Sequence, residues 1–136
     1  LEVLQLGANE VVVDVLLYVG RGNQRICEKP WATTTIDALC NLVFACGVAV
    51  AHRSISLQAV EADAMNEPRV VAAAKRVRWE VDTAQEVHGT IEPGKVVVRF
   101  TNGRKVEHYV DHALGHPTNP MSMQRLQEKL EDFIEE

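Results

Sequence analysis

The chain has 136 residues, which fits one domain of ordinary size. Apolar residues make up 46% and charged residues 24% of it, as in globular proteins with a buried core. The net charge of −5 is spread along the chain and leaves no continuous basic face, so the composition argues against a nucleic-acid-binding protein.

The sequence carries no sign of secretion or of membrane insertion. No basic stretch followed by a long apolar segment stands near the N-terminus, so we expect no signal peptide. The most apolar segment, residues 36–51, is shorter than the roughly 20 residues that span a bilayer. The cysteines lack CxxC spacing and are expected to be buried, reduced thiols of a cytoplasmic protein: Cys27, Cys40 and Cys46.

Residues 9–19 are mostly β-branched or aromatic and predict a strand. Alternation would place Val11, Val13, Val15 and Leu17 on one face. The other face is only partly polar, so we expect cover on both sides. Residues 20–32 hold glycines and Pro30 and predict a loop. Gly20-Arg21-Gly22 lacks the third glycine of a phosphate loop and is interpreted as a flexible turn.

Residues 36–51 follow three threonines and predict one long helix that is apolar on every side and therefore buried on every side. Asp37 lies in the first turn of this helix, where its negative charge interacts favourably with the helix dipole. Gly47 costs a helix about 1 kcal/mol relative to alanine, and close packing of another element would explain its presence. Two short helices are expected next, at 57–65 and 67–76.

The remaining segments predict three strands and a last helix. Residues 77–81 alternate apolar and charged side chains, and residues 96–100 and 105–110 flank an Asn-Gly pair typical of a type I′ hairpin turn. Residues 122–134 form an amphipathic pattern with Ser122 as N-cap. The order βαααβββα predicts an α+β fold, with an antiparallel sheet of about four strands and helices packed on one face.

Side chains that could carry chemistry are few. His108, His112 and His116 recur every fourth residue, but Gly115 and Pro117 interrupt any helix that would align them as metal ligands. We therefore expect no metal site and no cofactor. The acidic residues at the end of the chain are interpreted as a solvated helix face: Glu128, Glu131, Asp132, Glu135 and Glu136.

Several motifs, in order, resemble the MmgE/PrpD family over residues 9–136. The C-terminal ones are Asn102-Gly103-Arg104, then Gly-His-Pro-Thr-Asn-Pro-Met-Ser at residues 115–122, then Leu126, Lys129 and Phe133. The upstream ones are Pro30, Asp37-Ala38 with the apolar helix, and Asn-Glu-Pro-Arg-Val at residues 66–70.

The resemblance implies an activity on small polycarboxylates. The family includes 2-methylcitrate dehydratase, cis-aconitate decarboxylase and iminodisuccinate epimerase, which need no cofactor and place the active site between a large helical domain and a smaller α+β lid. This sequence is similar to the lid alone: residues 1–118 as the lid-like domain, and 119–136 as a helix returning toward a helical domain that is not represented. Asn41 and Phe44 stand where the family has a serine and a substrate-facing tyrosine, and phenylalanine has no hydroxyl to donate.

We therefore expect a lid-like domain or stand-alone remnant of such a lyase or isomerase, catalytically incompetent alone. Its exposed apolar surface would favour a homo-oligomer. Two alternatives stay open. One is an independent module that binds a small acid or another protein. The other is an enzyme with a new site between subunits that uses His108, His112 or Lys95.

Overall fold

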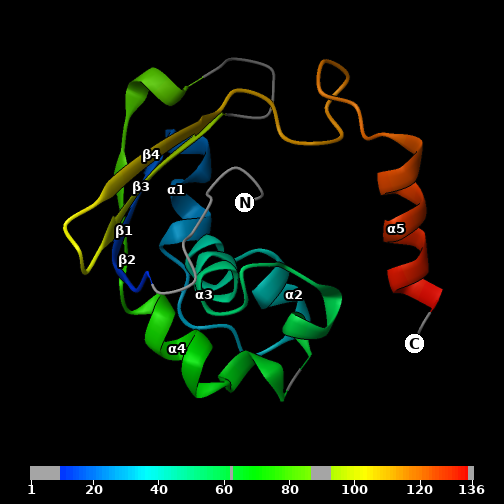
Figure 1. Cartoon of the computed structure of the whole chain (residues 1–136), viewed down its shortest axis with the longest axis horizontal. Helices are drawn as coiled ribbons and strands as arrows, with labels where there is room; N and C mark the ends of the chain where they lie inside the picture. The colour runs from blue at the N-terminus through cyan, green and yellow to red at the C-terminus, as the bar shows by residue number, and fades with distance from the viewer. Residues whose placement is uncertain (1–9, 62, 87–92, 135–136) are drawn as a thin grey trace.

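The computed structural model describes residues 10–61, 63–86 and 93–134 (Figure 1). Its strands are β1 (Val12–Val19), β2 (Val77–Val81), β3 (Gly94–Phe100) and β4 (Lys105–Val110). Its helices are α1 (Arg21–Cys27), α2 (Thr35–Leu39), α3 (Leu42–His52), α4 (Pro68–Ala74) and α5 (Met123–Ile134). Short 3-10 turns lie at Leu57–Val60 (η1), Ala64–Asn66 (η2) and Thr83–Gln85 (η3). The α+β prediction is confirmed.

The four strands form one sheet in the order β2-β1-β3-β4. The expectation of a purely antiparallel sheet was wrong, because β1 and β2 run parallel while the other two pairs are antiparallel. The cause lies in the connection between them: α1 to α4 separate β1 from β2 in the sequence, and a crossover of this length returns the chain in the same direction.

The predicted hairpin joins β3 to β4, but its turn differs from type I′. Asn102 is not among the described residues with positive φ, whereas Gly103 has φ 81°. The Gly103 N–H donates to the Phe100 carbonyl and the Phe100 N–H to the Arg104 carbonyl, both at 3.0 Å. This is a three-residue loop in which glycine takes the left-handed position after a type I turn.

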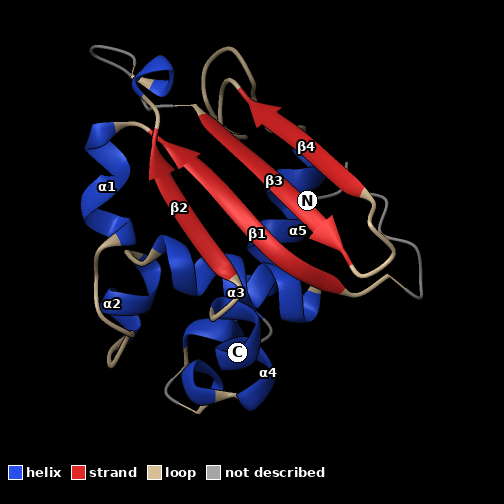
Figure 2. Cartoon of the chain, turned by 90° about the vertical axis from the view of Figure 1, so that its left-hand side faces the viewer, coloured by secondary structure: helices blue, strands red, loops and turns tan. Residues whose placement is uncertain are grey.

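The helices cover one face of the sheet, as predicted (Figure 2). The covered face contributes Val15, Leu17 and Phe100 to the core. The faces of β1 were assigned wrongly at its start, because a bulge between Val12 and Asp14 shifts the register. Val12 consequently turns into the core, and Val13 is 49% exposed.

The predicted helix over 36–51 is two helices, α2 and α3, separated at Cys40 and Asn41. The Asn41 side chain is buried and caps α3: its Oδ1 accepts from the Phe44 N–H at 3.0 Å, and its Nδ2 donates to the Pro30 carbonyl at 2.9 Å. Burial on every side was wrong for α2, where Ile36 is 74% and Leu39 63% exposed, whereas no residue of α3 before His52 is exposed. No helix among the described residues is both long and apolar enough to cross a bilayer.

Two further segments differ from expectation. The loop predicted at 20–32 contains α1, which contacts α3, β1 and β2 and buries Cys27. The helix predicted at 57–65 is replaced by the 3-10 turns η1 and η2. Both segments are short enough for tertiary contacts, more than local propensity, to decide their backbone conformation.

Asp14 is the centre of an ion-pair network on the open face of the sheet. Arg78 binds its carboxylate with two hydrogen bonds of 2.7 and 2.9 Å, and Arg99 binds it at 3.1 Å. These contacts, led by the hydrogen bonds from Arg78, hold the pKa of Asp14 below its ordinary value of 3.8. The carboxylate therefore links β1 to both of its neighbours.

We expect the network to make stability depend on pH in the acid range. The folded state binds the Asp14 proton more weakly than the unfolded state does, because the arginines stabilise the carboxylate. The stabilisation from Asp14 is therefore complete above the unfolded-state pKa and is lost as the pH falls through the lower folded-state pKa. Asp14→Asn should therefore flatten the decrease in unfolding free energy below about pH 4, measured by urea denaturation. An equally steep decrease in the variant would contradict this role.

Candidate functional site

Asn41 and Phe44, the two positions singled out by the resemblance, both lie in the core. The Phe44 side chain is 1% exposed, and its ring meets the edge of Trp31 at a centroid distance of 5.4 Å. It belongs to a cluster that joins α3 to α4 and to the 3-10 turns, together with Val48, Val60, Met65 and Val70. In this chain both side chains support the fold: Asn41 caps α3 and Phe44 anchors it.

The structure separates the histidines. His108 and Lys95 line one hollow of about 210 Å³ beside Leu42. His112 and His116 stack on each other elsewhere, with ring centroids 4.3 Å apart. The described residues contain no group of three or more histidine, cysteine, aspartate or glutamate side chains that could hold a metal ion.

Lys95 is engaged in an ion pair. Its Nζ lies 2.8 Å from a Glu107 carboxylate oxygen and 5.2 Å from the centroid of the Tyr18 ring. The hydrogen bond to Glu107 is the main cause of a raised pKa for Lys95. The lysine is therefore held in its charged form, which suits binding an anion better than accepting a proton.

The cysteines fall into two classes. Burial raises the pKa of Cys27 to about 11 and that of Cys46 to about 12, so both thiols stay protonated at neutral pH and are poor nucleophiles. Cys40 is exposed, which contradicts the expectation that all three would be buried. It stands at the break between α2 and α3, where the chain turns outward.

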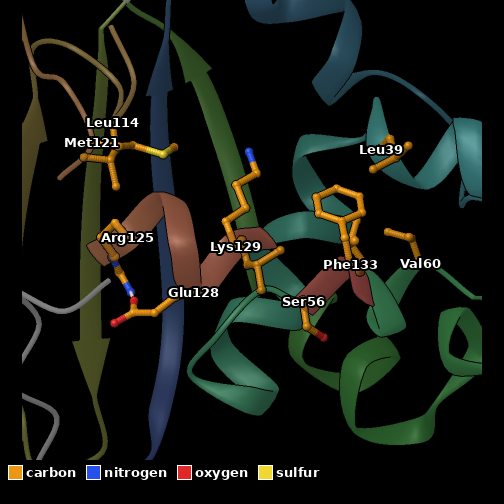
Figure 3. A pocket seen from close by; sticks show the side chains of 11 residues that line it. Leu39, Ser56, Val60, Leu114, Met121, Arg125, Glu128, Lys129 and Phe133 are labelled. Atoms are coloured by element: carbon orange, nitrogen blue, oxygen red, sulfur yellow. Dashed lines mark hydrogen bonds and ion pairs between the residues drawn. The ribbon is translucent and has the colours of Figure 1, made fainter. Parts of the chain in front are cut away.

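A groove of about 400 Å³ lies beside α5 (Figure 3). Leu39, Leu57 and Val60 are among the residues that line it. Figure 3 shows Phe133 of α5 next to Val60, with Leu39 nearby. Leu114 and Met121 close one end. We call this feature the α5 groove.

The loop before α5 sets the position of that helix. Gly115 has φ 98°, and its N–H donates to the Asn119 carbonyl at 2.8 Å. The Asn119 Nδ2 in turn donates to the His112 carbonyl at 2.9 Å. Ser122 then caps α5, because its Oγ accepts from the Arg125 N–H at 3.2 Å, as the sequence predicted.

α5 itself exposes the apolar side of an amphipathic helix, and Figure 1 shows it standing apart from the sheet. Leu130 is 58% and Phe133 54% exposed, which is unusual for side chains of this size. Exposed apolar residues elsewhere near the groove include Leu39 and Ile55. Phe133 is the apolar residue of α5 that also lines the groove. Exposed apolar side chains gathered on one side of a helix are typical of a surface that packs against another polypeptide.

Four of the eleven residues that line the α5 groove are polar or charged: Ser56, Arg125, Glu128 and Lys129. Arg125 pairs with Glu128 at 3.3 Å, and Lys129 lies beside them (Figure 3). Glu131, another of the predicted acidic residues, accepts a hydrogen bond from Gln127. Glu135 and Glu136 lie outside the described residues. The groove is suited to packing and to positioning a charged partner group, and its amphipathic helix was the one part of it visible in the sequence.

A search of curated proteins found no match. The family model described as the MmgE/PrpD C-terminal domain matches residues 5–136, nearly the whole chain. The chain therefore belongs to the MmgE/PrpD family and represents its C-terminal domain.

Proposed function

We propose that this chain is the lid-like part of an MmgE/PrpD-type lyase or isomerase for small polycarboxylates and that it does not catalyse turnover alone. Residues 1–118 would form the lid, and 119–136 would return to a helical domain of the complete enzyme. The exposed apolar side of α5 is the observation that carries this proposal. A helix with such a side needs a partner surface, and the match to a C-terminal domain is compatible with a partner domain in the complete enzyme.

The composition of the core supports the second part of the proposal. The substrate-facing hydroxyl expected at position 44 is replaced by a phenyl ring that is buried against Trp31. The Asn41 side-chain oxygen and nitrogen both form hydrogen bonds with the backbone of the domain itself. In a site shared with another domain, a chain with these side chains would form part of the wall and exclude water. It would not supply a group for proton transfer at these two positions. With its reduced cysteines, it would work in the cytoplasm.

The experiment is a turnover assay of the 136-residue chain with cis-aconitate, 2-methylcitrate and an aspartate-derived imine, with light scattering on the same sample. We expect a folded protein, no turnover of the three compounds, and a mass above that of the monomer, because the apolar side of α5 would self-associate when no helical domain covers it. Clear turnover would overturn the proposal and place a site between subunits, with His108 and His112 the first residues to change.

A second candidate is a binding module that uses the same apolar side to form a homo-oligomer. Leu130→Lys and Phe133→Lys on that side should shift the light-scattering mass toward the monomer. Gln124→Lys, on the polar side of α5, serves as the matched control and should leave the mass unchanged. If the wild-type chain is already a monomer at high micromolar concentration, self-association is contradicted, whereas the lid proposal still depends on the turnover assay.

A further inference from the structure

A second hollow, of about 360 Å³, lies where β1 begins, between the end of α3 and α4. Three arginines line it, Arg53, Arg69 and Arg76. Its other lining residues are Glu10 and small or apolar side chains: Val11, Val12, Val50, Ala51, Ala72 and Ala73. It shares no lining residue with the α5 groove, so it is a separate feature of the surface.

α4 and the turn after it bring the two arginines to one hollow. Arg69, Ala72 and Ala73 are spaced at i, i+3 and i+4 on α4 and therefore share one side of the helix, whereas Arg76 lies in the turn between α4 and β2. The two alanines are short and leave room beside the helix. Both arginines thus line the hollow together with small side chains.

Each of these two arginines is held in place by one backbone carbonyl. Arg69 Nη2 donates to the Ala51 carbonyl at 3.2 Å, and Arg76 Nη1 donates to the Val12 carbonyl at 2.8 Å. A guanidinium has five N–H donors, so these contacts fix the orientation of each side chain and leave most of its donors for another acceptor.

The charge of the pair is not neutralised within the part of the chain that the structure describes. No carboxylate there forms an ion pair with Arg69 or Arg76. The acidic lining residue, Glu10, turns its carboxylate to the β3–β4 hairpin, where Arg104 binds it at 2.6 Å and Asn102 at 3.2 Å. Arg69 and Arg76 thus bring two positive charges to one hollow, in a chain whose net charge is −5.

We propose that this hollow binds a small dianion, a phosphate or a dicarboxylate, between Arg69 and Arg76. The planar guanidinium forms paired hydrogen bonds with either group, and two guanidiniums match its two negative charges. The site does not depend on the α5 groove, and its occupation would tie α4 to the start of β1.

The test is isothermal titration calorimetry of the full chain at low ionic strength, with inorganic phosphate and with succinate in separate titrations. We expect saturable binding of one anion per chain, with the tighter of the two probes identifying the ligand class. Arg69→Gln and Arg76→Gln should each weaken binding by about tenfold or more. Arg25→Gln, an exposed arginine on α1 outside the hollow, should leave binding unchanged.

Two further measurements separate lost binding from lost folding. Arg69→Lys keeps the charge but not the planar fork, so it should bind more weakly than wild type and more tightly than Arg69→Gln. Amide chemical shifts of the wild-type chain, followed during the same titrations, should move most at residues 69–76. Absence of saturable binding up to about 10 mM would overturn the proposal. So would equal binding by folded Arg76→Gln, or shifts centred elsewhere.

Discussion

Phe44→Ala should lower the free energy of unfolding by about 3–5 kcal/mol, a large part of the stability of a domain of this size. The ring is 1% exposed and packs among side chains from α4 and the 3-10 turns, so its removal leaves a cavity where several elements meet. The edge contact with Trp31 at 5.4 Å would be lost as well. Urea denaturation followed by tryptophan fluorescence measures the change.

Phe44→Leu is the matched control for that experiment. Leucine fills most of the space and should cost less than about 1.5 kcal/mol. If alanine and leucine at this position cost the same small amount, Phe44 does not anchor the helical layer as described.

Gly47→Ala should also destabilise the chain, by about 1–3 kcal/mol, although alanine is the better helix former by about 1 kcal/mol. A Cβ atom at Gly47 would lie 2.8 Å from the Ala74 Cβ and 3.1 Å from the Val70 carbonyl oxygen. Neither neighbour is the end of a flexible side chain, so α3 and α4 would have to move apart. The unfolding free energy from urea denaturation tests this directly.

Gly94→Ala provides the comparison for Gly47→Ala. It makes the same chemical change at a strand position where an added Cβ meets no atom within 4 Å. We expect no loss of stability there. A Gly47→Ala variant as stable as wild type would mean that the two helices tolerate a wider separation.

The α3–α4 contact shows what the sequence could reveal about the fold. Gly47 in an otherwise apolar helix predicted a close neighbour, and α4 is that neighbour. The direction of β2 was not predictable in the same way, because side-chain alternation records which face of a strand is buried and not which way its partner runs. The bulge that exposes Val13 was not predictable either, because no residue in the sequence around it indicates a bulge.

The candidate site was visible only in part. The amphipathic pattern of α5 and the cap at Ser122 follow from local rules and were predicted correctly. The opposite wall of the α5 groove comes from segments more than 60 residues earlier, and no periodicity links them. The arginine pair was missed because Arg69 and Arg76 resemble ordinary solvated charges until α4 and the start of β1 are placed together.

The central place of β1 has a consequence for how the chain acquires its structure. Both neighbours of β1 come later in the sequence: Asp14 meets Arg78 after 64 residues and Arg99 after 85. Contacts over such separations are slow to form, because the closure of long loops must precede any gain from pairing. During synthesis, β1 would emerge before the other three strands but could pair with β3 only much later, whereas the contacts between α3 and α4 could already form. The strand at the middle of the finished sheet would thus be among the last to be fully paired.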